Sequence, residues 1–384
     1  MAVSASFHFA KSLFSYHSII MTSHNHLGTV DVNGFNITKR KHVSSMGLQV
    51  NDPPAKVINA TRASAIDWNT PLPTTKAGSS KPTTKLEEVK QRNPKIMDSD
   101  DLGVGRMVKE GFVYRQNFDI RSYEIGPDQT ASIETIMNHM QETTLNHLKA
   151  IGLLGDGYGS TPEMCKKNLI WVMVKMQVVV DRYPIWGGVV QIDAWKAAYR
   201  KNGLGGNWIF YDCKTGEMLI RASSIWVMMN TETRRISRFP DEVRAEIQPV
   251  LLDTPPAVEE QTIKWSKRDY NIVPHVRNGL MPRWSDVDVN QHVNNTKYIG
   301  LLLESVPKTI MKNYELASMT LEYCRECEMD SVLQSHTYVI GTNDVDNITD
   351  HHDHVDCEHL LQLDNLGVGS EEEIMKGRTT WRLK

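Results

Sequence analysis

The chain contains 384 residues, of which 40% are hydrophobic and 23% are charged, as in an ordinary soluble globular protein. This length is sufficient for two domains with substantial cores. The formal net charge of −3 argues against a general nucleic-acid-binding protein. No uncharged apolar run reaches the roughly 18 residues needed to cross a bilayer, so no integral membrane segment is expected.

The N-terminal quarter of the chain has the composition of a targeting signal. Residues 1–30 contain no Asp or Glu and are rich in Ser and His, and the segment after them is rich in Ser, Thr, Pro and Asn. Organellar transit peptides have this composition, and the absence of Arg before Arg40 favours a plastid over a mitochondrial address. We therefore predict a plastid transit peptide and a disordered linker over residues 1–95.

Residues 133–151 are predicted to form a long amphipathic helix. Apolar residues recur there at spacings of three and four, and Gly152 closes the pattern. Beyond Pro162, segments rich in Val, Ile and Trp predict strands over residues 175–180, 189–195, 208–211 and 218–230. A hairpin turn is predicted at residues 212–216, and a short helix at residues 240–250.

The pattern restarts after a proline-containing linker at residues 253–257. A helix is predicted over residues 296–306 and is stopped by Pro307. Strands are predicted over residues 318–325, 331–341, 355–363 and 373–383. One helix followed by several antiparallel strands in each half predicts an α+β fold built by internal duplication.

Residues 286–295, Asp-Val-Asp-Val-Asn-Gln-His-Val-Asn-Asn, combine the side chains of a hydrolytic site. Asp288, Asn290 and His292 alternate with other residues, so an extended backbone would present all three on one side. A carboxylate, an amide and an imidazole can together hold and deprotonate a water at neutral pH. Asn294 or Asn295 could cap the following helix, whose free backbone amides would then face the same point.

The same segment has plainer interpretations. A calcium loop would require Gly and Glu where the chain has Gln291 and Lys297, so that reading is rejected. A polar turn that only caps the helix remains an alternative.

The internal duplication can be aligned on its acidic residues. Matching Asp128 to Asp288 places Thr130 opposite Asn290 and Ser132 opposite His292. On this alignment the first half lacks the imidazole.

The five cysteines, an odd number without regular spacing, do not predict a disulfide framework. Cys324 and Cys327 form one Cys-x-x-Cys, but no second pair follows at the spacing of a zinc site. Neither a metal nor a cofactor is predicted. The sequence also lacks the Gly-x-Ser-x-Gly elbow, the phosphate-binding Gly-x4-Gly-Lys-Ser/Thr loop and the His-Glu-x-x-His motif.

Three phrases carry a resemblance to the plant acyl-acyl carrier protein thioesterases of the FatB type. They are Gly-Ser-Thr-Pro-Glu-Met-Cys (159–165), Asp-Arg-Tyr-Pro (181–184) and Trp-Ser-Asp-Val-Asp-Val-Asn-Gln-His-Val-Asn-Asn (284–295). The resemblance extends from about residue 106 to the C-terminus. It implies a tandem double hot-dog, in which each half wraps an antiparallel sheet around one long helix. Residues 96–255 would form the N-terminal domain with the acyl tunnel, and residues 256–384 the catalytic domain.

The resemblance also implies an activity. Members of this family reside in plastids and release fatty acid from acyl carrier protein, so we expect hydrolysis of saturated, by default palmitoyl, acyl carrier protein in the chloroplast stroma. The acylated carrier protein would be the partner, and a homodimer is an expectation of the fold. Where the family has a basic pair, this chain has Gly205-Gly206, which keeps open a weakly active copy that only binds acyl chains or their carrier.

The family's catalytic residues correspond to Asp288, Asn290, His292 and Glu326, with Cys327 as an alternative nucleophile. In the scheme that we prefer, Glu326 and His292 activate water, Asn290 positions the water or the carbonyl, and Asp288 orients His292. In the rival scheme His292 activates the Cys327 thiolate, which the neighbouring glutamates would disfavour.

Two further sets of residues complete the expectations from the resemblance. Met137 and Met140 would line the acyl tunnel. Five basic residues could meet the acidic carrier, or could simply form a solvated basic face: Lys166, Lys167, Arg234, Arg235 and Arg238.

Overall fold

The computed structural model describes residues 105–155, 158–260, 273–340, 353–364 and 372–384. The predicted transit peptide and linker, residues 1–95, lie outside these ranges. No helix within the described ranges is long and apolar enough to cross a membrane.

The first half of the fold contains six strands and three α-helices within the described residues. They are β1 (Arg106–Val108), β2 (Val113–Asp119), α2 (Ile133–Ala150), α3 (Pro162–Lys166), β3 (Leu169–Val180), β4 (Val189–Tyr199), β5 (Gly203–Asp212), β6 (Met218–Asn230) and α4 (Asp241–Ile247). The second half contains β7 (His275–Leu280), α5 (Tyr298–Leu303), α6 (Lys308–Asn313), β8 (Tyr314–Tyr323), β9 (Leu333–Val339), β10 (His354–Leu363) and β11 (Glu373–Leu383).

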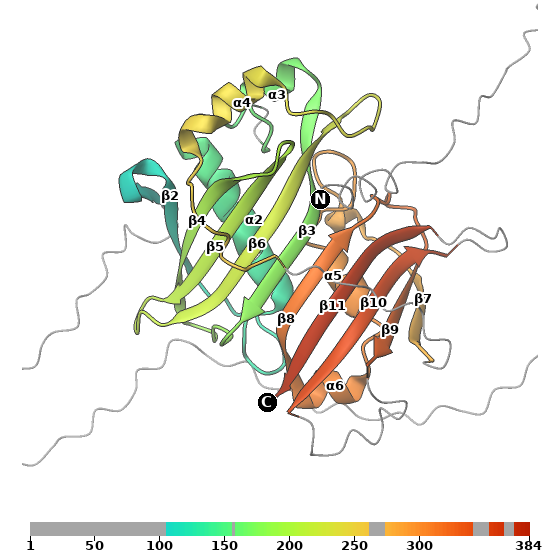
Figure 1. Cartoon of the computed structure of the whole chain (residues 1–384). Helices are drawn as coiled ribbons and strands as arrows, with labels where there is room; N and C mark the ends of the chain where they lie inside the picture. Colours follow the sequence, from blue (N-terminus) through green and yellow to red (C-terminus); the bar gives the residue numbers. More distant parts are fainter. Residues whose placement is uncertain (1–104, 156–157, 261–272, 341–352, 365–371) are drawn as a thin grey trace, which may run out of the picture. The chain divides into compact units, whose positions relative to one another are not determined.

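All eleven strands form one antiparallel sheet in the order β1-β2-β4-β5-β6-β3-β8-β11-β10-β9-β7. Apart from the short β1, each half has its first strand at the outer edge and its second at the centre, where β3 pairs with β8 (Figure 1). Helix α2 follows the first long strand of the first half and α5 follows that of the second half, and both lie against one face of the sheet (Figure 1). Identical strand order in both halves confirms the duplicated α+β architecture of a tandem hot-dog.

The predicted long helix is confirmed as α2. The hydroxyl of Ser132 caps it by accepting a hydrogen bond from the amide of Thr135 at 3.1 Å. Its apolar face, which includes Met137 and Met140, is buried, and the indole N–H of Trp208 on β5 donates to the Met140 carbonyl at 3.1 Å. This contact fixes α2 against the sheet because both groups are buried and neither can bond to water instead.

The helix predicted over residues 296–306 is confirmed in a shorter form as α5, which ends at Leu303. Helix α6, which begins directly after Pro307, was not predicted. Helix α5 packs closely on the sheet at Gly377 of β11, where an added Cβ atom would lie 2.6 Å from Leu302 Cδ2.

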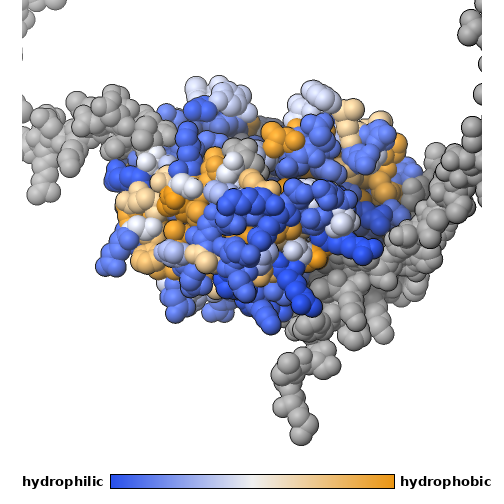
Figure 2. Space-filling model, turned by 90° about the horizontal axis from the view of Figure 1, so that it is seen from above, coloured by the Kyte–Doolittle hydropathy of each residue, from blue (hydrophilic) through white to orange (hydrophobic). Residues whose placement is uncertain are grey.

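Several strands begin earlier than the sequence predicts. Strand β5 includes the Gly205-Gly206 pair, whose weak preference for extended structure conceals the strand in the sequence. Strand β7 was not predicted, because it is almost entirely exposed and lacks the alternation of a half-buried strand. On the face seen from above in Figure 2, hydrophilic side chains surround separate hydrophobic patches.

Candidate active site

Three of the candidate residues, Asp288, Asn290 and His292, lie on one closed loop. Val287 pairs with Val293 across an isolated antiparallel bridge, and the Asp288 amide donates to the His292 carbonyl at 2.9 Å. The Asp288 carboxylate accepts a hydrogen bond from the Asn290 amide at 2.8 Å, which folds the backbone into a turn. The predicted extended backbone is therefore wrong, because an aspartate side chain outcompetes the extended form.

The imidazole of His292 is oriented by its own loop. Its Nδ1 atom lies 2.7 Å from the carbonyl oxygen of Asn290, which assigns the proton of the neutral ring to Nδ1. The Nε2 atom then carries the lone pair and lies 3.2 Å from Glu326 Oε2. The orienting role expected for the Asp288 side chain thus belongs to the Asn290 carbonyl.

Arg234 completes this group from the first half of the chain. It lies in the loop after β6, and its Nη2 atom is 3.2 Å from His292 Nε2 and forms an ion pair with Glu326. The side chains of His292, Glu326 and Arg234 are 27%, 33% and 35% exposed, so water reaches all three. From the sequence, Arg234 could meet the carrier protein or belong to a solvated basic face, whereas its side-chain contacts in the structure are with His292 and Glu326.

Cys327 is separated from this arrangement by burial. It is 3% exposed, and its amide donates to the Tyr298 hydroxyl at 3.0 Å. Burial raises the pKa of the Cys327 thiol to about 11, so the thiol is protonated at neutral pH. Burial also raises the pKa of Cys324 to about 12. Among the described residues, no three His, Cys, Asp or Glu side chains are grouped as a metal site.

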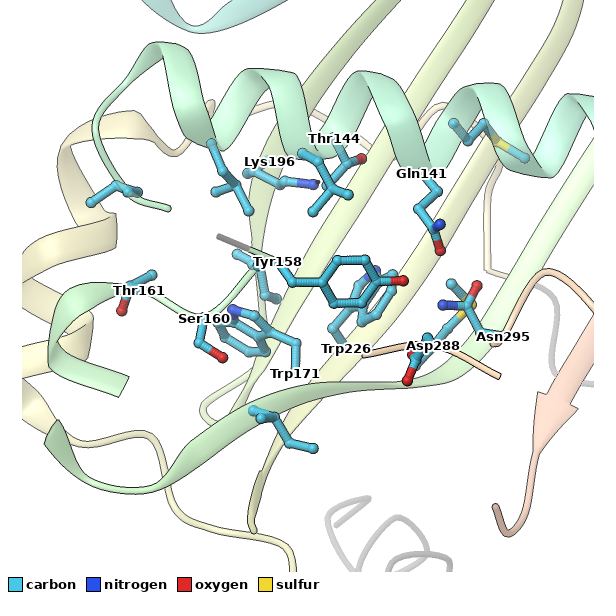
Figure 3. A pocket seen from close by; sticks show the side chains of 18 of the residues that line it. Gln141, Thr144, Tyr158, Ser160, Thr161, Trp171, Lys196, Trp226, Asp288 and Asn295 are labelled. Atoms are coloured by element: carbon cyan, nitrogen blue, oxygen red, sulfur yellow. Dashed lines mark hydrogen bonds between the residues drawn. The ribbon is translucent and has the colours of Figure 1, made fainter. Parts of the chain in front are cut away.

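Two adjoining pockets meet at the candidate residues. The outer pocket encloses about 820 Å³, its open mouth included, and is lined by Asp288, Asn290, His292 and Glu326. The deep pocket encloses about 1090 Å³ on the same basis and extends between α2 and the sheet of the first half (Figure 3). The two pockets adjoin, because both are lined by Ile170, Trp171, Met173, Trp226, Asp288, Asn290 and Asn295.

The wall of the deep pocket is mainly apolar. Met137 and Met140 of α2 belong to it, together with tryptophans from β3, β5 and β6. Figure 3 shows Asp288 and Asn295 at one end of this pocket and Thr161 at the other. A long apolar ligand can therefore extend from the candidate residues into the first half.

Of the two backbone amides expected to face the site, those of Asn294 and Asn295, only the Asn295 amide is free, within the described part of the chain, to bind a ligand. The Asn294 amide already donates to the Asp286 carbonyl at 2.8 Å. The Asn295 amide has no acceptor among the described residues, and the Tyr323 hydroxyl holds the Asn295 carbonyl at 3.1 Å. Tyr158, which the sequence did not single out, accepts a hydrogen bond from the Asn294 side chain at 2.9 Å.

The first half contains a loop of the same backbone form that lacks the histidine of the candidate site. Ile125 pairs with Ala131 as Val287 pairs with Val293. The Gly126 amide donates to the Thr130 carbonyl at 2.9 Å, and Gln129, like Gln291, has a φ of 63°. These contacts place Gly126, Asp128 and Thr130 opposite Asp288, Asn290 and His292, so the register predicted from the acidic residues is wrong by two positions.

Comparisons with known proteins agree with this geometry. The family model of the acyl-ACP thioesterase N-terminal domain matches residues 111–247, and that of the C-terminal domain matches residues 272–383. A chloroplastic palmitoyl-acyl carrier protein thioesterase of Arabidopsis thaliana is 57% identical over 285 residues, covering 74% of this chain and 68% of that protein. One of Gossypium hirsutum is 54% identical over 295 residues, covering 77% of this chain and 70% of that protein.

A solved structure shares the fold as well as the sequence. The 12:0-ACP thioesterase from Umbellularia californica is 46% identical and superposes with a TM-score of 0.64, covering 72% of this chain and 96% of that chain. The similarity includes both halves, since the family models match a segment of each. The chain therefore belongs to the acyl-ACP thioesterase family.

Proposed function

We propose that this chain hydrolyses the thioester of saturated acyl-acyl carrier protein, with palmitoyl as the default chain, in the plastid stroma. The observation that carries the proposal is the meeting of His292 and Glu326 at the opening of a long apolar pocket. The chloroplastic relatives named as palmitoyl-acyl carrier protein thioesterases support the substrate and the compartment.

The nucleophile in this proposal is water. A water that contacts both His292 Nε2 and Glu326, in place of the Arg234 contact to Nε2, donates one proton to the Nε2 lone pair, while Glu326 accepts a hydrogen bond from its other hydrogen. The water oxygen forms a bond to the thioester carbon. The carbon–sulfur bond then breaks, and His292 returns the proton to the departing sulfur, so that a carboxylic acid and a thiol are formed.

The carbonyl oxygen gains negative charge during this attack. The Asn295 amide stabilises that charge, since residue Asn295 lines both pockets and its amide has no acceptor among the described residues. The Asn290 side chain, which lines both pockets as well, is a second donor. Asp288 shapes the loop that presents them, through its hydrogen bond to the Asn290 amide.

The acyl chain occupies the deep pocket, with Met137 and Met140 in its wall. Cys327 takes no part as a nucleophile in this proposal. It lines neither of the two pockets, and burial keeps its thiol protonated.

The proposal is tested by turnover of saturated C8–C18 acyl carrier proteins by the full chain. We expect free fatty acid from wild type and from Cys327→Ala, and a loss of about 100-fold or more in folded His292→Ala and Glu326→Gln. Thr130→Ala changes the equivalent position of the first-half loop and serves as the matched control with near wild-type turnover. Activity lost only in Cys327→Ala would restore the thiolate scheme. No release from any chain, despite binding, would indicate an acyl-binding protein.

A further inference from the structure

The deep pocket contains a buried cation, Lys196. On strand β4, one face of the sheet carries Ile192, Ala194 and Lys196, and all three are buried. The Lys196 residue is 5% exposed. Figure 3 shows its amine directed into the pocket beside Thr144 of α2. A long apolar ligand in this pocket therefore passes a charged group.

The amine of Lys196 has only weak polar contacts among the described residues. Its hydrogen bond to Thr144 Oγ1 is long, at 3.5 Å, and it lies 5.5 Å from the centre of the Trp208 ring. No carboxylate of the described residues lies within 4.0 Å of it. Burial lowers the pKa of Lys196 to about 8, so most of the amine is still charged at pH 7.

The surroundings add no compensating charge. His147, one helical turn beyond Thr144 on α2, is buried, and neither of its ring nitrogens has a hydrogen-bond partner among the described residues. Gly206 lies opposite Lys196 in the β4–β5 register, and a Cβ atom there would lie 2.8 Å from the Trp208 ring. The glycine thus leaves room for the Trp208 ring and the Ser224 hydroxyl, and Trp208 in turn lies beside the Lys196 amine.

Free-energy considerations favour a polar ligand at this point. A plain hydrocarbon passing Lys196 displaces water from a buried ammonium group and offers no acceptor, which is strongly unfavourable. A hydroxyl or keto oxygen on the chain accepts the hydrogen bond and satisfies the amine. A ligand that leaves such a buried donor without an acceptor is therefore disfavoured, in addition to any discrimination by chain length.

We propose that the preferred substrates are saturated acyl chains bearing a hydroxyl or keto oxygen, and that Lys196 donates the hydrogen bond that selects them. The inference rests on the proposed thioesterase function and narrows its substrate class. The oxygen lies on the segment of chain beside Thr144, about one turn of α2 deeper than Gln141 (Figure 3).

The test compares matched acyl carrier proteins that differ only in this oxygen. The full chain is given palmitoyl carrier and hydroxy- or oxo-palmitoyl carriers with the oxygen at successive positions, and kcat/KM is measured for each. We expect one position to exceed palmitoyl by about 10- to 100-fold, the effect of a hydrogen bond to a charged donor. Lys196→Met should remove this preference and increase turnover of palmitoyl carrier.

Lys175→Met is the matched control. Lys175 is also buried, at 8% exposure, but it pairs with Glu260 at 3.6 Å and lines neither of the two pockets. This variant should keep the preference of wild type. If the wild-type protein hydrolyses palmitoyl carrier as fast as every oxygenated carrier, the inference is overturned and the proposed function is unaffected.

A second readout separates the two proposals if no carrier is hydrolysed. Trp171, Trp208 and Trp226 line the deep pocket, so their fluorescence reports binding of the same acyl carriers. Tighter binding of an oxygenated chain, lost in Lys196→Met, supports the inference although the proposed function fails. Equal affinities for plain and oxygenated chains overturn it.

Discussion

Arg234 and Glu326 form an ion pair that joins the two halves of the chain at the candidate site. Arg234 follows β6, whereas Glu326 follows β8, and the two strands are brought near one another because both pair with β3. The guanidinium also contacts His292 Nε2, so one side chain from the first half touches both groups that would activate water.

We expect Arg234→Gln to lower kcat/KM by about 10- to 100-fold, the effect of losing one charge-assisted hydrogen bond. Without the guanidinium, Glu326 is no longer held at the His292 ring. The measurement is steady-state turnover of palmitoyl carrier together with thermal unfolding. Arg182→Gln is the control, since it removes an exposed arginine that pairs with Glu217 at 2.6 Å. Equal turnover in both variants would contradict a positioning role for Arg234.

Two buried histidines predict loss of stability in mild acid. Burial lowers the pKa of His359 to about 3, and burial together with the Lys196 charge lowers the pKa of His147 to about 3. Between about pH 6.5 and pH 3 the unfolded chain binds protons at these residues and the folded chain does not. The free energy of unfolding should therefore decrease as the pH is lowered through this range, by about 1.4 kcal/mol per pH unit for each histidine.

Urea unfolding at pH 7, 6 and 5 measures this dependence. His359 is held between the hydroxyls of Thr337 and Thr379 at 2.9 and 2.7 Å, which the amide of Gln can also bond. His359→Gln should thus fold and lose one histidine's share of the slope, whereas His354→Gln changes an exposed residue of β10 and should leave the slope unchanged. A slope that is the same in all three proteins would refute the assignment.

Helices and strands with a clear local residue pattern could be predicted from the sequence. Helix α2 was found from its apolar spacing, and β6 from its run of β-branched and aromatic residues. The side chains of the site were also found, because a carboxylate, an amide and an imidazole at close spacing carry recognisable chemistry. Their placement was not found, since the Asp288 side chain turns the backbone through a hydrogen bond that alternation does not reveal.

Residues that reach the site from far away could not be predicted. Arg234 is 58 residues from His292, and Tyr158 is 136 residues from Asn294. Their contacts depend on the pairing of β3 with β8, which no local pattern encodes. The register of the duplication failed for a related reason: Gly126 and Asp288 occupy equivalent backbone positions although their side chains have nothing in common.

Two glycines at helix α5 should respond oppositely to alanine. Gly377→Ala should destabilise the fold by about 1–3 kcal/mol, because its Cβ would lie 2.6 Å from Leu302 Cδ2 and 3.3 Å from Leu321 Cδ2 in a packed core. Gly300, within α5, has only Glu134 Oε2 near its Cβ, at 3.7 Å, so Gly300→Ala should stabilise by about 0.5–1 kcal/mol. Chemical denaturation measures both, and a stabilising Gly377→Ala would show that the second half is looser than described.

Docking of the acidic carrier protein is expected to depend on Arg235 and Arg238. Lys166 pairs with Glu163 at 2.6 Å and Lys167 with Glu242 at 3.1 Å, so their charges are partly neutralised. Arg235 and Arg238 are exposed and, within the part of the chain that the structure describes, have no carboxylate within 4.0 Å. Both arginines are close in the chain to Ile236, which lines the outer pocket.

Reversing both charges, Arg235→Glu with Arg238→Glu, should raise KM for palmitoyl carrier by about tenfold and weaken the dependence of kcat/KM on salt. Hydrolysis of a small palmitoyl thioester that lacks the carrier protein should be unchanged, because that substrate meets only the pockets. Lys166→Glu with Lys167→Glu is the control of equal charge, and its effect on KM should be smaller. If the small thioester loses activity as well, the arginines support the site itself, and the carrier must dock on another face.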